Sequence, residues 1–186
     1  LQNLVDRLLA PYRTGRSLSD INIHEVLERV RQIILAEFPK GLSFIRDYDV
    51  SVPTLRGDRE QLLQVFLNIE KNAAEALDGK IAEGTAEIRV ITRVAQQVQI
   101  GLRRYRLALS IHIQDNGPGV PPEIRDRIFY PLVTGKANGS GLGLSLAQNF
   151  IRQHDGSIDV ESEPGKTDFR ILLPLSPPET GDISPA

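Results

Sequence analysis

The sequence predicts an α+β domain, because apolar residues recur along it at two different spacings. Residues 22–38, 58–76 and 141–154 carry apolar side chains at helical spacing. Residues 85–98 and 103–114 are instead rich in strand-forming residues and are separated by a short turn at Gly101, as in an antiparallel hairpin. Amphipathic helices and antiparallel strands in one chain of 186 residues favour the α+β class.

The composition suits one compact domain with a real core, since 40% of the residues are hydrophobic. The net charge of −2 creates no basic field, so we expect no nucleic-acid partner. No apolar run approaches the roughly 18 residues of a membrane helix, so we expect no membrane span. The chain has no cysteine, which excludes disulfides and cysteine-based zinc sites and fits a cytoplasmic location.

Both ends of the chain differ from its middle. Residues 1–11 have a helical apolar pattern that stops at Pro11, and residues 12–21 have no periodicity, as in a linker. We expect the main domain to span residues 22–175 and the Pro-, Ser- and acid-rich residues 176–186 to form a disordered tail. Because the chain starts within a helical pattern and has no initiator Met, we expect a fragment of a longer protein.

Two predicted helices begin with capping residues. Asn22, followed by Glu25, starts a helix that runs to Pro39, and Asp58, followed by Gln61, starts the next. Between them, residues 42–48 suit a strand and residues 52–55 a second, shorter one.

The helix after Asp58 carries a polar face beside its apolar stripe. Asn68, Asn72 and Glu75 share that face, about 100° round the helix from the stripe. It can be an ordinary solvated face or the border of a pocket. The amide oxygen of an Asn is a good ligand for Mg²⁺, which commonly shares phosphate oxygens.

Asp115 ends a strand whose apolar residues occupy alternate positions, and it falls on their side. A carboxylate there needs a hydrogen-bond partner to offset its desolvation, and the exocyclic amine of a purine is a suitable one. Gly117 and Gly119 follow directly and allow a close backbone approach that a side chain would block. A short helical turn is expected from Pro121 to Phe129.

A second glycine cluster, at residues 139–143 (GSGLG), precedes the third helical pattern. It should open a helix whose N-terminal amides can receive phosphate oxygens. Its spacing differs from the Rossmann fingerprint and from the Walker loop. We expect Gly156 to close this helix as its C′ residue and residues 157–162 and 167–175 to form a last hairpin.

Four blocks stand in order: residues 68–73 (NIEKNA), 115–119 (DNGPG), 129–136 (FYPLVTGK) and 139–144 (GSGLGL). Together they resemble the N, first-glycine, F and second-glycine boxes of sensor histidine kinases. The resemblance covers about residues 20–175. Residues 45–49 (IRDYD), 105–108 (YRLA) and a short lid further resemble the NtrB type, which belongs to nitrogen regulation.

The resemblance implies a Bergerat-type ATP-binding fold, a two-layer α/β sandwich in which helices cover one face of a mixed sheet. Asp115 would bind the adenine amine, Gly117 and Gly119 would shape the base pocket, Asn72 would ligate Mg²⁺, and Asn68 would lie near the phosphates. The phosphates themselves would be received at the start of the third helix. The residues implied there are Gly139, Gly141, Leu142, Gly143 and Leu144.

The lid would contribute Thr134 and Lys136. Lys136 is a candidate for charge neutralisation during transfer, and an ordinary solvated loop lysine is an equal alternative. Many kinases of the family carry a basic or neutral residue where this chain has Glu75, so its role is open between solvent contact and an action through water on the metal. His24 is not followed by the Asn-Pro that accompanies the phosphoacceptor histidine, so we do not expect it to be the acceptor.

The implied function is a protein-histidine kinase catalytic domain using ATP and Mg²⁺. Its implied partners are its own dimerisation and phosphoacceptor domain, whose last helix would end at residues 1–11, an NtrC-like response regulator and a PII-type signal protein. A hydrolytic ATPase of the same superfamily is one alternative, disfavoured because Asn68 stands where those enzymes carry a water-activating Glu. A nucleotide-gated interaction module is another.

Overall fold

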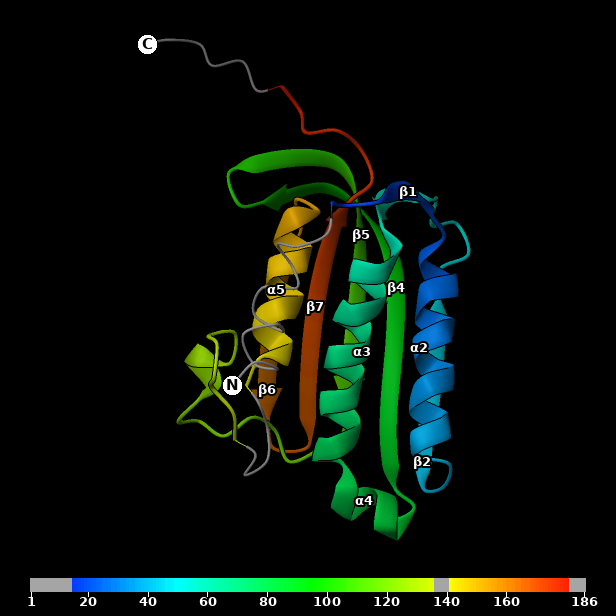
Figure 1. Ribbon diagram of the computed structural model, residues 1–186, viewed down its shortest axis with the longest axis vertical. Coiled ribbons are helices and arrows are strands. Elements are labelled where there is room, and N and C mark those ends of the chain that lie inside the picture. The colour runs from blue at the N-terminus through cyan, green and yellow to red at the C-terminus, as the bar shows by residue number, and fades with distance from the viewer. Residues whose placement is uncertain (1–14, 136–140, 181–186) are drawn as a thin grey trace.

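The computed structural model describes residues 15–135 and 141–180 and shows two layers, a sheet and a layer of helices on one of its faces (Figure 1). The five-stranded sheet has the order β2-β4-β5-β7-β6. Its strands are β2 (Leu42–Tyr48), β4 (Ala86–Ile100), β5 (Arg103–Asp115), β6 (Ser157–Glu163) and β7 (Lys166–Pro174). β2 and β4 pair in parallel and the other neighbours are antiparallel, so the sheet is mixed and the expected fold class is confirmed.

Three helices lie side by side on the sheet: α2 (Ile23–Glu37), α3 (Arg59–Ala76) and α5 (Gly143–Gln153) (Figure 1). α3 is the middle one, and its Val65, Phe66 and Ile69 are inaccessible to solvent. Two short helical segments, α4 (Asp78–Glu83) and η1 (Arg125–Arg127), follow α3 and the Asp115 turn. Because neighbours cover this helix on several sides, its buried residues extend beyond the predicted stripe to Glu70 and Ala74.

Both predicted helix caps are present. The Asn22 side chain accepts the His24 backbone N–H at 3.0 Å, and the Asp58 carboxylate accepts that of Gln61 at 3.1 Å. Each bond satisfies one of the backbone donors that a helix leaves unpaired at its start.

The segment expected to be a linker is partly a strand. β1 (Leu18–Ile21) pairs antiparallel with β3 (Leu55–Asp58). The second strand, expected at residues 52–55, is this β3, and it begins only at Leu55. Ile21 is only 2% exposed, so the pairing buries an apolar side chain that a free linker would leave in water. A four-residue strand shows too little alternation to be recognised from the sequence.

Part of the expected tail is also ordered. The Leu175 N–H donates to the Leu107 carbonyl at 3.0 Å, and the Glu179 N–H donates to the Arg104 carbonyl at 2.8 Å. The chain between these two residues therefore lies alongside the first half of β5. The other expectations for the two ends fall on residues 1–14 and 181–186, which lie outside the described residues.

The end of α5 differs from the expectation by one residue. Asp155, with φ 57°, takes the left-handed conformation that we assigned to Gly156. Gly156 is needed for another reason: a Cβ there would lie 2.4 Å from the Leu172 carbonyl oxygen. The glycine therefore marks a close approach of helix and sheet.

His154 links the end of α5 to the start of α3. Its Nδ1 lies 2.7 Å from the Phe150 carbonyl oxygen, while Nε2 lies 2.9 Å from the Asp58 N–H, which donates to it. An acceptor at Nε2 requires the neutral ring, and burial lowers the pKa of His154. His154 therefore joins the two helices through hydrogen bonds of its neutral ring.

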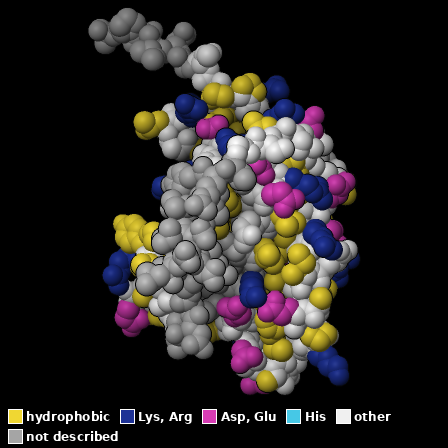
Figure 2. Space-filling view, viewed as in Figure 1, with side chains coloured by type: hydrophobic (Ala, Val, Ile, Leu, Met, Phe, Trp, Pro, Cys, Tyr) yellow, Lys and Arg dark blue, Asp and Glu magenta, His cyan; other side chains and the backbone are white. Residues whose placement is uncertain are grey.

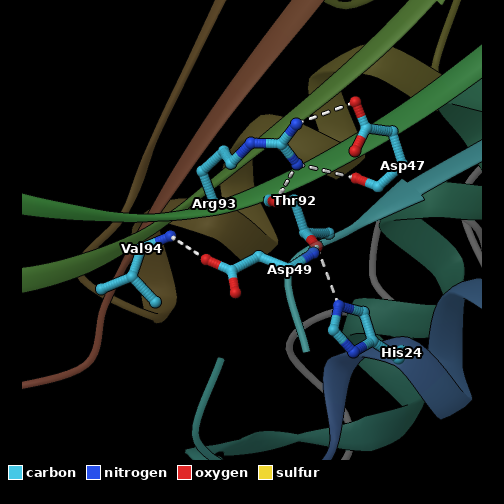
Figure 3. A network of polar contacts seen from close by, with 6 residues as sticks. All are labelled: His24, Asp47, Asp49, Thr92, Arg93 and Val94. Carbon is cyan, nitrogen blue, oxygen red and sulfur yellow. Dashed lines mark hydrogen bonds and ion pairs between the residues drawn. The ribbon is translucent and has the colours of Figure 1, made fainter. Parts of the chain in front are cut away.

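A polar network ties the loop after β2 to β4 and to the start of α2 (Figure 3). The Thr92 hydroxyl lies 2.8 Å from His24 Nε2 and accepts the Asp49 N–H at 3.0 Å, while Arg93 pairs with Asp47 at 2.8 Å. His24 also stacks on Tyr48, with ring centroids 4.7 Å apart. These contacts give His24 a structural role.

None of the helices in the described ranges is long and apolar enough to cross a membrane.

Glu70, on α3, is an ionisable group inside the core. It is 0% exposed, and among the described residues neither carboxyl oxygen has a hydrogen-bond partner. Burial, reinforced by the charge of Glu28, raises the pKa of Glu70 well above its ordinary value of 4.5. A core without a partner for the carboxylate holds the protonated form more readily.

We expect Glu70→Gln to stabilise the protein increasingly as pH rises. With a raised folded-state pKa, the contribution of Glu70 is fully present below pH 4.5 and is lost as pH increases toward the folded-state value. Urea unfolding from pH 4.5 to 8.5 should show the variant gaining about 1–3 kcal/mol over wild type at the alkaline end. Glu60→Gln, on the exposed part of the same helix, controls for the loss of one charge, and a pH-independent difference for Glu70→Gln would contradict the prediction.

Candidate functional site

Asp115 lies at the end of β5 and is 7% exposed, on the apolar side of the strand as the alternation predicts. The Gly117 N–H donates to its Oδ1 at 2.9 Å. Burial raises the pKa of Asp115, and the bond from Gly117 opposes that effect. Within the described part of the chain no donor reaches Oδ2, so one half of a buried carboxylate can accept a bond from a ligand.

The turn after Asp115 depends on glycine at two positions. A Cβ on Gly117 would lie 2.8 Å from Asp115 Oδ1. Gly119 has φ 87°, and a Cβ there would lie 2.7 Å from the Glu163 carbonyl oxygen. The Gly165 N–H donates to the Gly117 carbonyl at 2.9 Å, which joins this turn to the β6–β7 turn. Both glycines thus permit the contacts that bring the turn beside Asp115.

Thr167 is a site candidate that the sequence analysis missed. It is paired with Asp115 in the β5–β7 register and is 4% exposed. Its Oγ1 lies 2.9 Å from the Ser162 hydroxyl, which accepts the Val120 N–H at 2.7 Å. The only signal in the sequence was its place at the start of the last strand, which becomes informative once the strand order is known.

The polar face of α3 turns toward the start of α5. Asn68 donates from Nδ2 to the Gly143 carbonyl at 3.0 Å, so it lies where the glycine cluster opens the helix. Asn72, one turn further along α3, is half-buried, and Glu75 is exposed. The structure therefore brings Asn68 and the second glycine cluster together, as the phosphate-site hypothesis requires.

α5 begins at Gly143, with Leu142 at its N-cap and 8% exposed. The first amides of an α-helix have no partner within the helix and can receive anion oxygens. The residues concerned are Gly143, Leu144 and Ser145. Gly143, the first of them, lies beside Asn68 at one end of the candidate site.

Gly141 connects this helix start to the segment after η1. It has φ 67°, its carbonyl accepts the Leu132 N–H at 2.9 Å, and a Cβ on it would lie 2.5 Å from the Leu132 carbonyl carbon. Leu132 itself is a non-glycine residue with φ 66°, an uncommon and strained conformation.

Of the predicted lid residues, Thr134 is exposed. Lys136 and Gly139, two of the predicted site residues, lie outside the described residues.

The described residues contain no group of three or more His, Cys, Asp or Glu side chains that could hold a metal ion.

Residues 57–177 match the family described as histidine kinase-, DNA gyrase B- and HSP90-like ATPase. This segment includes Asp115, both glycine turns and the polar face of α3. The chain belongs to this family. Its curated relatives include the sensory histidine kinase/phosphatase NtrB of Salmonella typhimurium, 49% identical over 94% of the chain, and that of Vibrio alginolyticus, 46% identical over 94%. The chain spans about half the length of these relatives, 49% in both cases.

Solved structures of histidine kinases share the fold. The mycobacterial sensor histidine kinase MprB superimposes with a TM-score of 0.67 at 24% identity, covering 89% of this chain and 100% of that one. Full-length ShkA in complex with AMPPNP gives 0.73 at 24%, covering 94% and 35%. ThkA in complex with the response regulator protein TrrA gives 0.70 at 21%, covering 94% and 47%. The two-layer architecture is thus that of histidine kinase catalytic domains.

We predict that Gly141→Ala weakens binding of a non-hydrolysable ATP analogue by about tenfold or more, because its Cβ would overlap the Leu132 backbone and displace the start of α5. Gly79→Ala is the matched control, since a Cβ there meets nothing within 4 Å. Fluorescence titration of both variants would check this, and equal affinities would show that the contact between Gly141 and Leu132 does not matter for binding.

Proposed function

We propose that this chain is the ATP-binding catalytic domain of an NtrB-type sensor histidine kinase. The observation that carries the proposal is the half-open carboxylate of buried Asp115, set beside a glycine turn in a chain 49% identical to NtrB. A purine amine supplies the missing donor. The fold and the family are consistent with that ligand.

The nucleotide would extend from Asp115 toward α5. Asp115 would accept the adenine amine while Gly117 and Gly119 keep the base pocket open. The first amides of α5 would receive phosphate oxygens, with Asn68 next to them. Leu142, buried at the N-cap, would set the position of those amides by packing.

Asn72 is our candidate for the Mg²⁺ ligand, through its side-chain amide oxygen. A bound Mg²⁺ would supply charge neutralisation on the phosphates. Thr134 and Lys136 are proposed as the lid groups that approach the same phosphates, and Lys136 as the residue that offsets the charge developing on the transferred group.

The reaction would be transfer of the γ-phosphoryl group from ATP to a ring nitrogen of a histidine, with ADP as the leaving group. The acceptor histidine would belong to the dimerisation domain of the complete protein, and a response regulator aspartate would receive the group next. Catalysis of this kind depends on positioning and charge stabilisation. We propose an NtrC-like regulator and a PII-type protein as further partners, and a cytoplasmic location.

Hydrolysis is the less favoured activity, because the α3 residue beside the phosphate site is an amide. Both ends of the Asn68 amide are engaged within the protein, and an amide cannot serve as a general base toward water.

Phosphotransfer in trans tests the proposal. The chain, radiolabelled ATP and Mg²⁺ would be mixed with a separately produced dimerisation domain of an NtrB relative or with the same domain carrying an acceptor His→Gln change. We expect acid-labile, base-stable label on the wild-type acceptor domain only. Label on neither domain, despite tight ATP binding by the chain, would refute kinase activity and favour the interaction-module alternative.

A further inference from the structure

A two-step side-chain relay joins α3 to the start of α5. Gln64 Nε2 donates to Asn68 Oδ1 at 2.7 Å, and Asn68 Nδ2 donates to the Gly143 carbonyl at 3.0 Å. Gln64 and Asn68 are one helical turn apart and both half-buried. A Cβ on Gly143 would lie 3.6 Å from Asn68 Cγ, so the two helices meet closely at this point.

The relay fixes which end of the Asn68 amide faces α5. The oxygen and the amino group of a carboxamide are nearly equal in size, so hydrogen bonds alone decide the orientation. The Gly143 carbonyl can only accept, so it draws the amino group of Asn68 toward α5, and the Gln64 amino group then holds Oδ1 on the α3 side by donating to it. The reversed orientation would place Oδ1 against the Gly143 carbonyl oxygen, with two acceptors in contact.

The oriented amino group has a second hydrogen. One hydrogen of Asn68 Nδ2 is used by the Gly143 carbonyl, and the other has no acceptor within the described part of the chain. The amino group thus adds a donor beside the backbone amides of the first turn of α5, which have no partner within the helix. A polyphosphate needs donors in this place, and an amide oxygen there would repel it.

We propose that Gln64 is a positioning residue for the phosphate subsite, acting through Asn68. It keeps the Asn68 amide in its donor orientation and holds the Gly143 end of α5 against α3. The inference rests on the proposed function, because it takes the start of α5 to be where the phosphates bind. It concerns the phosphates alone, since Gln64 contacts nothing at Asp115.

Gln61 is a matched control within the same pair of helices. Its Nε2 donates to Gln153 Oε1 at 3.0 Å, so it uses the same amide donor as Gln64, in a bond that joins α3 directly to the other end of α5. A Met in place of either Gln keeps the length of the side chain and removes the donor. The two substitutions therefore remove a similar bond, one beside the phosphate subsite and one remote from it.

The test is calorimetric titration of the chain with adenosine and with a non-hydrolysable ATP analogue plus Mg²⁺. We expect Gln64→Met to weaken binding of the ATP analogue about fivefold to tenfold, the usual effect of one lost hydrogen bond to a polar group, and to change adenosine binding less than twofold. Gln61→Met should change neither affinity by more than about twofold.

Gln64→Glu gives a sharper outcome. A carboxylate can only accept, so it would compete with the Gly143 carbonyl for the Asn68 amino group, and its negative charge would oppose the phosphates as well. The loss of ATP-analogue affinity should exceed that of Gln64→Met, again without loss of adenosine affinity. Thermal unfolding of each variant would show that the domain stays folded.

Two results would overturn the role of Gln64: unchanged ATP-analogue affinity in both Gln64 variants, or equal losses for adenosine and the ATP analogue, which a general structural defect would give. Failure of the proposed function has a different signature. In that case the wild-type chain itself would bind the ATP analogue no better than adenosine, whatever residue stands at position 64.

Discussion

The packing of α3 between α2, α5 and the sheet is the constraint on which the rest of the structure depends. Phe66 and Ile69 in the middle of the helix are fully buried. At its start, the Asp58 carboxylate caps the helix, and the Asp58 N–H donates to His154 at the end of α5. The helix can then tolerate two helix-unfavourable asparagines and the buried Glu70, whose carboxyl has no hydrogen-bond partner in residues 15–135 and 141–180. The start of α5 then contacts α3 through the hydrogen bond from Asn68 to the Gly143 carbonyl.

The two halves of the candidate site differ in how they are supported. Asp115 belongs to the central strand β5, and its turn is tied to β6 and β7 through Ser162, Thr167 and Gly165. Among the described residues, the contacts that support the phosphate end are the Asn68 relay and the junction of Gly141 with the strained Leu132.

Much of the fold could be predicted from the sequence, because its signals are local. Alternation placed Asp115 on the buried side of its strand, and the residues Asn22 and Asp58 gave the starts of two helices. The strand β1 escaped prediction because only Ile21 of its four residues is buried, and its partner lies far along the chain. Thr167 and the Gln64 relay escaped for the same reason. Their roles depend on the β5–β7 register and on the contact of α3 with α5, which no single stretch of sequence encodes.

The most direct test of this account is whether Asp115 binds the base of ATP. The chain should bind a non-hydrolysable ATP analogue with micromolar to millimolar affinity in a calorimetric titration, and Asp115→Asn should weaken that binding at least about tenfold while the variant unfolds at a similar temperature. The oxygen of the substituted amide can still accept the Gly117 N–H, but its amino group would face the adenine amine, donor against donor. Equal affinity in the two proteins would contradict the placement of adenine at Asp115 and, with it, the assignment of the whole site.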